Sequence, residues 1–253
     1  MASAIVKGII STQNDVEIIL FDKNPEVYKA LDEYQIRKTQ DSGDLIGASD
    51  ILFLCVKPQD IDAALADIKG KICNEQILVS IVTGISTGYI MNKLDSNCKV
   101  IRTMPNTPML ISHGAVAAAY NPPVTEDDYG LVRKILQPIA TVEVLPEDKM
   151  NEVTCVNASS PAYIYLFAKT VVEEAEEQGI DPEKALNLFA STLIGAGKML
   201  IETEKTPSEL IDIVQSPNGT TEKAMDVLKS RGFSDTIREA MRACTKRAIE
   251  LGK

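Results

Sequence analysis

The sequence predicts an α/β protein in two parts: a doubly wound sheet domain over residues 1–147, followed by an all-helical domain over residues 148–253. In the first part, short apolar runs alternate with amphipathic segments at helical spacing. The runs are apolar on both faces, as in parallel strands that helices cover on both sides. From Asp148 onward strand signals vanish, and segments with a helical period follow one another.

The composition is that of a globular protein, with 45% hydrophobic and 25% charged residues. A net charge of −10 provides no general basic surface for nucleic acid or anionic lipid, so we expect neither partner. Five dispersed cysteines without a CxxC pair predict reduced thiols and a cytoplasmic protein. The single histidine, His113, argues against histidine-based metal sites and catalytic triads. No apolar run approaches the ~18 residues of a membrane span.

Within the first part, the elements are expected in the following order. A helix covers residues 1–10 without a capping residue in front, a strand covers 16–21, and Pro25 opens a helix that continues to about residue 34. Further helices are predicted at 43–48, 61–68, 86–94 and 126–139, and further strands at 51–56, 77–82, 100–101, 115–120 and 141–145.

Several polar turns follow these strands. They contain Asp22-Lys23-Asn24, Lys57-Pro58 and Thr83-Gly84, with the extended turn 104–108 nearby. The carboxyl ends of parallel strands share one edge of a sheet, and doubly wound sheets bind ligands at that edge. Each segment taken alone is also consistent with a plain turn.

The second part predicts helices at 148–178, interrupted by Pro161, and at 181–202, 208–215, 221–230 and 234–251. Small residues at 157–162 and 195–197 allow close helix crossings. Such positions suit packing against another chain as well as packing within one chain.

A turn between two of these helices has the composition of an anion site. Pro217 ends the preceding helix, Asn218-Gly219 allow a tight turn with positive φ, and Thr220-Thr221 open the next helix. Free N–H groups and the positive end of a helix dipole bind carboxylates or phosphates. The alternative is an ordinary helical corner capped by threonine.

Four segments together resemble the pyrroline-5-carboxylate reductase family: residues 53–58, 102–108, 157–163 and 216–221. They stand in the family's order and spacing, and the resemblance covers essentially the whole chain. The last two segments are specific to this family.

The resemblance implies a Rossmann-type dinucleotide-binding domain and a helical dimerisation domain that interlocks with its twin, in a homodimer or higher oligomer with the site between subunits. The implied reaction is the last step of proline biosynthesis, hydride transfer from NAD(P)H to 1-pyrroline-5-carboxylate to give L-proline. Ser216, Gly219, Thr220 and Thr221 would hold the substrate carboxylate, and the Thr221 hydroxyl would contact the ring nitrogen as the catalytic group. Glu147 matches a position near the substrate, or is simply a helix-starting acid.

The cofactor-binding residues implied by the family are Met1, Lys23, Asn24, Val56, Lys57, Pro58, Thr83 and Asn106. Lys23 and Asn24 match the contacts to the adenosine 2′-phosphate, which favours NADPH. Asp22 points the other way, because an acid at the end of this strand accepts a hydrogen bond from a free ribose 2′-hydroxyl and repels a phosphate. We expect NADPH, with NADH as the alternative.

Three departures from the family pattern stand out. Asn157-Ala158 replace Ser-Gly, and Asn218 replaces a glycine, although asparagine is well suited to follow glycine into a left-handed conformation. The sequence also begins after the family's first strand and glycine-rich turn, which suggests a misplaced start. Without that central strand we expect unpaired sheet edges, weak cofactor binding and a destabilised amino-terminal half.

Two other functions remain open. A non-catalytic relative that binds a carboxylate or serves as a scaffold is favoured by the missing glycines, whereas the retained segments 157–163 and 216–221 favour the reductase. A reductase of β-hydroxyacids or other imines is disfavoured. Such enzymes generally use a lysine in the helical domain, whereas Lys169 and Lys198 lie in helices whose nearby patterns match the pyrroline-5-carboxylate reductase family, and surface lysines are usually just solvated. Ser159 and Tyr163 are expected to pack a helix crossing.

Overall fold

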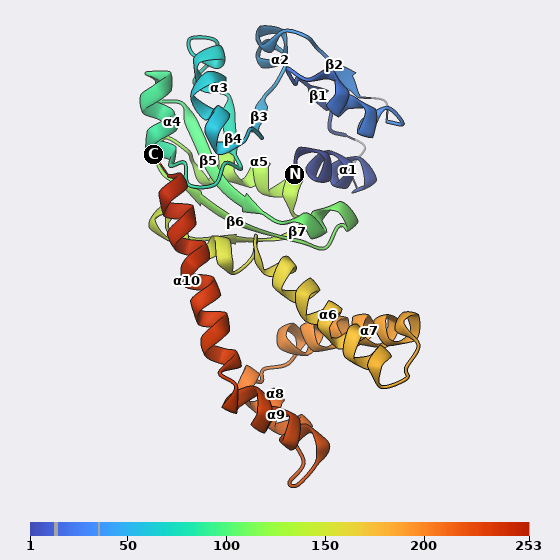
Figure 1. The fold of residues 1–253 in the computed structure, drawn as a ribbon. Coiled ribbons are helices and arrows are strands. Elements are labelled where there is room, and N and C mark those ends of the chain that lie inside the picture. Colours follow the sequence, from blue (N-terminus) through green and yellow to red (C-terminus); the bar gives the residue numbers. More distant parts are fainter. Residues whose placement is uncertain (13–14, 35, 253) are drawn as a thin grey trace. The chain divides into compact units, whose positions relative to one another are not determined.

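The computed structural model describes residues 1–12, 15–34 and 36–252 (Figure 1). The chain divides into two compact units, and each is described separately below. The first comprises Met1–Pro161 with Ala243–Lys253, and the second comprises Ala162–Arg242.

The first unit is built on a five-stranded sheet in the order β3-β4-β5-β6-β7. The strands β3 (Ile51–Leu54), β4 (Ile77–Ser80) and β5 (Lys99–Pro105) are parallel. After them, β6 (Gly114–Tyr120) runs antiparallel to β5, and β7 (Ala140–Val144) runs parallel to β6. The predicted mostly parallel sheet is therefore confirmed, with one antiparallel pair.

Helices cover both faces of this sheet (Figure 1). On one face, α1 (Ala2–Thr12) and α5 (Glu126–Leu136) join a core that includes Ile77, Val79 and Ile101. On the other face, α2 (Ser42–Gly47), α3 (Ile61–Ile68) and α4 (Thr87–Leu94) pack on Leu78 and Val100. Every residue of β4 is buried, which explains why the strand reads as a continuous apolar run.

A separate two-stranded parallel sheet precedes the main sheet. It pairs β1 (Ile19–Leu20) with β2 (Arg37–Lys38), a strand that the sequence pattern does not reveal. Among the described residues β3 pairs with β4 alone, so its other edge is unpaired. The predicted helix after Pro25 is wrong in type and length, because a 3₁₀ helix, η1 (Pro25–Leu31), begins at the Asn24 N-cap and ends early.

The predicted helix over 148–178 is also wrong in its first third. Two short 3₁₀ segments, η4 (Glu147–Lys149) and η5 (Glu152–Cys155), stand in its place, and α6 (Ser160–Glu177) begins beside Pro161. Proline is compatible with the first turn of a helix, where its missing N–H needs no partner. Pro138 stands at the other end of a helix, because α5 stops at Leu136 with Gln137 as its C-cap, directly before the proline.

The second unit contains most of α6, then α7 (Pro182–Glu202), α8 (Pro207–Val214), α9 (Thr220–Ser230) and the first half of α10 (Phe233–Leu251). Asp181 and Thr206 cap α7 and α8 through their side chains. Within Ala162–Arg242, all of which is described, Ala185 is the only buried residue. Large apolar side chains are exposed instead, including Tyr165, Leu166, Leu188, Ile194, Ile201, Ile213 and Val214.

The last turns of α10 belong to the first unit, where Ala248 is buried. They lie against the turn that follows β4. A Cβ atom placed on Gly84 would lie 2.8 Å from the carbonyl oxygen of Ala248 and 2.7 Å from the amide nitrogen of Gly252. Gly84 also has a φ of +81°, so both its backbone conformation and its surroundings require glycine.

Candidate functional site

The first part of the candidate site is the carboxyl edge of the parallel strands. Val56, Lys57 and Pro58 follow β3, Thr83 follows β4, and Asn106 follows β5. Because β3, β4 and β5 are neighbours and parallel, the structure brings these five predicted cofactor residues to one edge of the sheet. Lys57 is exposed, while Val56, Pro58 and Thr83 are half-buried and accessible at this edge.

Asn106 is held firmly at that edge. Its Oδ1 accepts a hydrogen bond from the Ala115 amide at 2.9 Å, and its Nδ2 donates to the Asn157 carbonyl at 3.2 Å. The Asn157 side chain in turn donates to the carbonyls of Met104 (2.7 Å) and Ala115 (3.2 Å). Asn157, which departs from the family pattern, thus joins the segment after η5 to the end of β5 and the start of β6.

Glu147 lies at the start of η4 with both carboxylate oxygens hydrogen-bonded. Its Oε1 accepts from the Thr87 amide at 2.6 Å, and its Oε2 accepts from the Thr87 hydroxyl at 2.6 Å and from Asn121 Nδ2 at 2.9 Å. Thr87 begins α4, so this carboxylate occupies the positive end of that helix dipole. Its contact with the substrate stays a prediction.

Arg102 is a buried charge that the sequence reasoning did not single out. It is 3% exposed, its Nη2 donates to Asn151 Oδ1 at 2.7 Å, and its Nε has no hydrogen-bond partner among the described residues. Burial lowers the pKa of Arg102, and the charges of Glu147 and Glu152 act in the opposite direction. The signal that could have identified it is a charged residue directly after the apolar pair Val100-Ile101 of a strand.

The predicted adenosine end of the cofactor site lies at the end of β1. Asp22 Oδ1 accepts from the Asn24 amide at 2.8 Å, and Asn24 Oδ1 accepts from the Glu26 amide at 3.1 Å. Lys23 is exposed beside them. The neighbouring β2 contributes Lys38, which stands opposite Leu20 and pairs with Asp32 at 2.6 Å.

Met1, the remaining predicted cofactor residue, is 43% exposed just before α1. Its carbonyl accepts hydrogen bonds from the amides of Ala4 and Ile5, at 2.8 and 3.1 Å. Through these bonds Met1 extends the first turn of α1.

The second part of the candidate site is the turn Ser216–Thr221 between α8 and α9. The Gly219 amide donates to the Ser216 carbonyl at 2.9 Å, and Asn218 has a φ of +59°. The expectation that asparagine adopts the left-handed conformation here is confirmed. A Cβ atom on Gly219 would lie 2.9 Å from the Ser216 carbonyl oxygen and 2.4 Å from Ser216 Oγ, so a side chain there would require the turn to shift.

The helix α9 begins at Thr220, with Gly219 as its N-cap and no side-chain capping bond. The amides of Thr220, Thr221 and Glu222 lie in the first turn, where a helix supplies no acceptor of its own. No acceptor for them lies among the described residues. Thr220 is exposed and Thr221 is half-buried, so these donors and the threonine hydroxyls can receive an anion.

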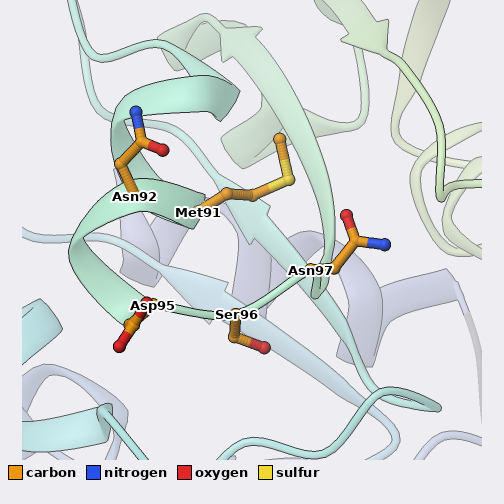
Figure 2. Close-up of a pocket in the computed structure, with 5 residues that line it drawn as sticks. All are labelled: Met91, Asn92, Asp95, Ser96 and Asn97. Atoms are coloured by element: carbon orange, nitrogen blue, oxygen red, sulfur yellow. The ribbon is translucent and has the colours of Figure 1, made fainter.

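A pocket elsewhere in the first unit does not compete with these regions. It has a volume of about 290 Å³ and lies where α4 ends and β5 begins, at the edge of the sheet opposite the predicted cofactor residues. Figure 2 shows that its lining side chains point in different directions: Met91, Asn92, Asp95, Ser96 and Asn97. Among the residues that the structure describes, no group of three or more His, Cys, Asp or Glu could hold a metal ion.

A doubly wound sheet, followed along the chain by helices with unpaired amides at the start of α9, defines the class of dinucleotide-binding proteins with a carboxyl-terminal helical domain. Residues 147–251 match the family model described as pyrroline-5-carboxylate reductase dimerisation. Residues 1–84 match the model described as NADP oxidoreductase, coenzyme F420-dependent.

Individual relatives agree over the full length. The pyrroline-5-carboxylate reductase of Escherichia coli K12 is 31% identical over 256 residues, covering 100% of this chain and 95% of the relative. The solved structure of such a reductase from Coxiella burnetii has a TM-score of 0.87 at 31% identity, covering 100% and 95% of the two chains. The Plasmodium falciparum enzyme with NADP bound shares the fold, with a TM-score of 0.91 at 24% identity and coverage of 99% and 94%. The chain belongs to the pyrroline-5-carboxylate reductase family.

Proposed function

We propose that this protein reduces 1-pyrroline-5-carboxylate to L-proline with hydride from NADPH, in the last step of proline biosynthesis. The observation that carries the proposal is the Ser216–Thr221 turn, which offers unpaired amides at the start of α9 inside the region that matches the reductase family. A sequence identity of 31% over the whole chain to reductases of this name supports the same reaction.

The substrate is a five-membered cyclic imine with a carboxylate. The amides of Thr220 and Thr221, with the Ser216 hydroxyl, would bind that carboxylate at the positive end of α9. Gly219 lets the backbone approach the ligand closely. The Thr221 hydroxyl would hydrogen-bond to the ring nitrogen, the atom that carries a proton in the product. Fixing the ring in this way would present one face of its imine carbon to the hydride donor, so the protein contributes to the reaction by orienting the substrate.

The cofactor, when bound, supplies the hydride. The residues present fit a dinucleotide, because Val56, Lys57, Pro58 and Thr83 are accessible along the carboxyl edge of parallel strands. Asn106, fixed by its two hydrogen bonds, would define one wall of that edge. Met1 is proposed as a further cofactor contact.

NADPH is proposed over NADH because Lys23 and Asn24 follow β1, and because the match of residues 1–84 is to an NADP oxidoreductase model. Asp22 opposes a 2′-phosphate, but one of its oxygens already accepts the Asn24 amide. Measuring both nucleotides tests this preference.

Glu147 is proposed to lie near the substrate while it caps α4 through Thr87. We further propose a functional division into a cofactor domain, residues 1–147, and a helical substrate and dimerisation domain, residues 148–253. The exposed apolar side chains of the helical unit favour a homodimer or higher oligomer through that unit.

The cytoplasm is the proposed location, on the basis of five cysteines that are all free. In the described part of the chain, every helix is too short or too polar to cross a membrane.

The deciding experiment follows the oxidation of NADPH, and separately of NADH, in the presence of 1-pyrroline-5-carboxylate. We expect substrate-dependent oxidation that Thr221→Val reduces strongly. Thr236→Val serves as a matched control, because Thr236 lies on α10 with its hydroxyl bonded to the Gly232 carbonyl. No oxidation with either nucleotide would refute the proposal. Stabilisation by proline in that case would favour the carboxylate-binding alternative.

A further inference from the structure

The turn that would hold the substrate carboxylate is itself fixed by an acidic residue that has no assigned role. Glu222 lies in the first turn of α9, and its Oε2 accepts a hydrogen bond from the Asn218 amide at 2.7 Å. Its side chain is half-buried. Asn218 is also the residue with a φ of +59°, which is the least favourable backbone conformation in the turn. The hydrogen bond therefore holds the turn at its most strained residue.

This bond divides the amides of the turn into two sets. The Asn218 amide is bonded to Glu222, and the Gly219 amide is bonded to the Ser216 carbonyl at 2.9 Å. The next amides, at the start of α9, have no acceptor among the described residues. The turn therefore keeps its shape without a ligand and still offers free donors to one.

We propose that Glu222 is a positioning residue, which holds the Ser216–Gly219 turn in the form that binds the substrate carboxylate. This inference rests on the proposed function. Glu222 acts through Asn218 and does not contact the substrate. Its negative charge at the positive end of α9 stabilises the helix start, and the hydrogen bond to Asn218 fixes the turn.

The chain provides a matched control in the neighbouring helix. Glu209 occupies the same place in the first turn of α8, and its Oε2 accepts from the Thr206 amide at 2.7 Å. Glu209 is exposed, and no ligand is proposed at that helix start. Glu209→Gln therefore makes the same chemical change without touching the substrate turn.

The test compares Glu222→Ala, Glu222→Gln and Glu209→Gln with the unmodified full-length chain. Glutamine keeps an acceptor oxygen for the Asn218 amide, whereas alanine does not. We expect Glu222→Ala to raise the KM for 1-pyrroline-5-carboxylate roughly 5- to 20-fold, with the KM for NADPH unchanged. Glu222→Gln should recover most of this loss, and Glu209→Gln should leave both constants at their original values.

Hydrogen exchange of the Asn218 amide provides a readout that needs no activity. Exchange should become faster in Glu222→Ala, and much less so in Glu222→Gln. Equal KM increases in the glutamine and alanine variants would overturn the proposal, since charge alone would then account for them. Unchanged Asn218 exchange in Glu222→Ala would overturn it as well. If the unmodified chain does not reduce the imine, the proposed function fails, and the exchange measurement still decides the role of Glu222.

Discussion

Gly84 is the position where a single methyl group should disturb both stability and cofactor binding. Its φ of +81° is unfavourable for alanine, at a cost of roughly 1–2 kcal/mol. The added Cβ would also lie within 2.7–2.8 Å of backbone atoms of Gly252 and Ala248, which cannot rotate away. Overpacking of this kind costs roughly 1–3 kcal/mol, so Gly84→Ala should destabilise the first unit by about 2–5 kcal/mol.

The assay is thermal unfolding, in which a loss of this size lowers the Tm by roughly 5–15 °C for a protein of this length. Gly70→Ala is the control, since Gly70 has a φ of +75° and a methyl group added there would meet nothing within 4 Å. That variant isolates the backbone cost. Equal Tm values for the two variants would refute the claim that the end of α10 packs tightly on the turn after β4. Because Thr83 adjoins Gly84, the KM for NADPH should also rise in Gly84→Ala alone.

Three further outcomes are expected. Thr221→Val should lower kcat with 1-pyrroline-5-carboxylate by about 10- to 100-fold, and Thr221→Ser should restore most of it, as steady-state kinetics will show. Asn157→Ala removes two hydrogen bonds, to the carbonyls of Met104 and Ala115, so chemical denaturation should show a loss of roughly 2–4 kcal/mol. Burial opposes ionisation of Asp128, but hydrogen bonds from Lys99 and Thr125 outweigh it and lower its pKa. The ionised carboxylate therefore stabilises the fold above its unfolded pKa of roughly 3.9, and this stabilisation is lost as pH falls below that value. Measurements of Tm against pH should show this acid-induced decrease in the unmodified chain, and Asp128→Asn should remove the part that Asp128 contributes.

Periodicity predicted the elements that are buried on both faces or strongly amphipathic. The helix over 61–68 is confirmed at both ends, and within the strand predicted at 77–82 the first four residues form the fully buried β4. The strand predicted at 100–101 is longer, because β5 continues through Arg102 and Thr103. Both residues are polar but less than 4% exposed, so the surrounding packing outweighs their composition.

Elements held by long-range contacts were harder to predict. β2 has only two residues, and both are charged and exposed, so no apolar period marks it. Its pairing with β1 depends on a partner that lies far back in the chain. The region 148–155 has a helical composition, yet it forms two short 3₁₀ segments, and Asn151 in the turn between them hydrogen-bonds to the buried Arg102. No local pattern predicts a hydrogen bond to a strand about 50 residues away.

The parts of the candidate site also differ in how far the sequence predicts them. Parallel topology alone places Val56, Thr83 and Asn106 at one edge, so a correct fold class predicts their proximity. The left-handed turn at Asn218 follows from the Asn-Gly dipeptide. The hydrogen bonds that fix these residues, from Asn157 to β5 and from Asn218 to Glu222, depend on side-chain geometry that spacing does not encode.

The two units also differ in how their cores are formed, and this bears on the substrate turn. The first unit buries apolar side chains on both faces of its sheet, whereas the second buries Ala185 alone within 162–242 and exposes Leu188, Ile201 and Val214. Helices with so little buried surface are marginal in water, because packing of an apolar face provides most of their stability. Association through this unit would bury that surface and stabilise α8 and α9. We therefore propose that the turn Ser216–Thr221, between those helices, gains order when the chains assemble, and that the oligomer binds the imine.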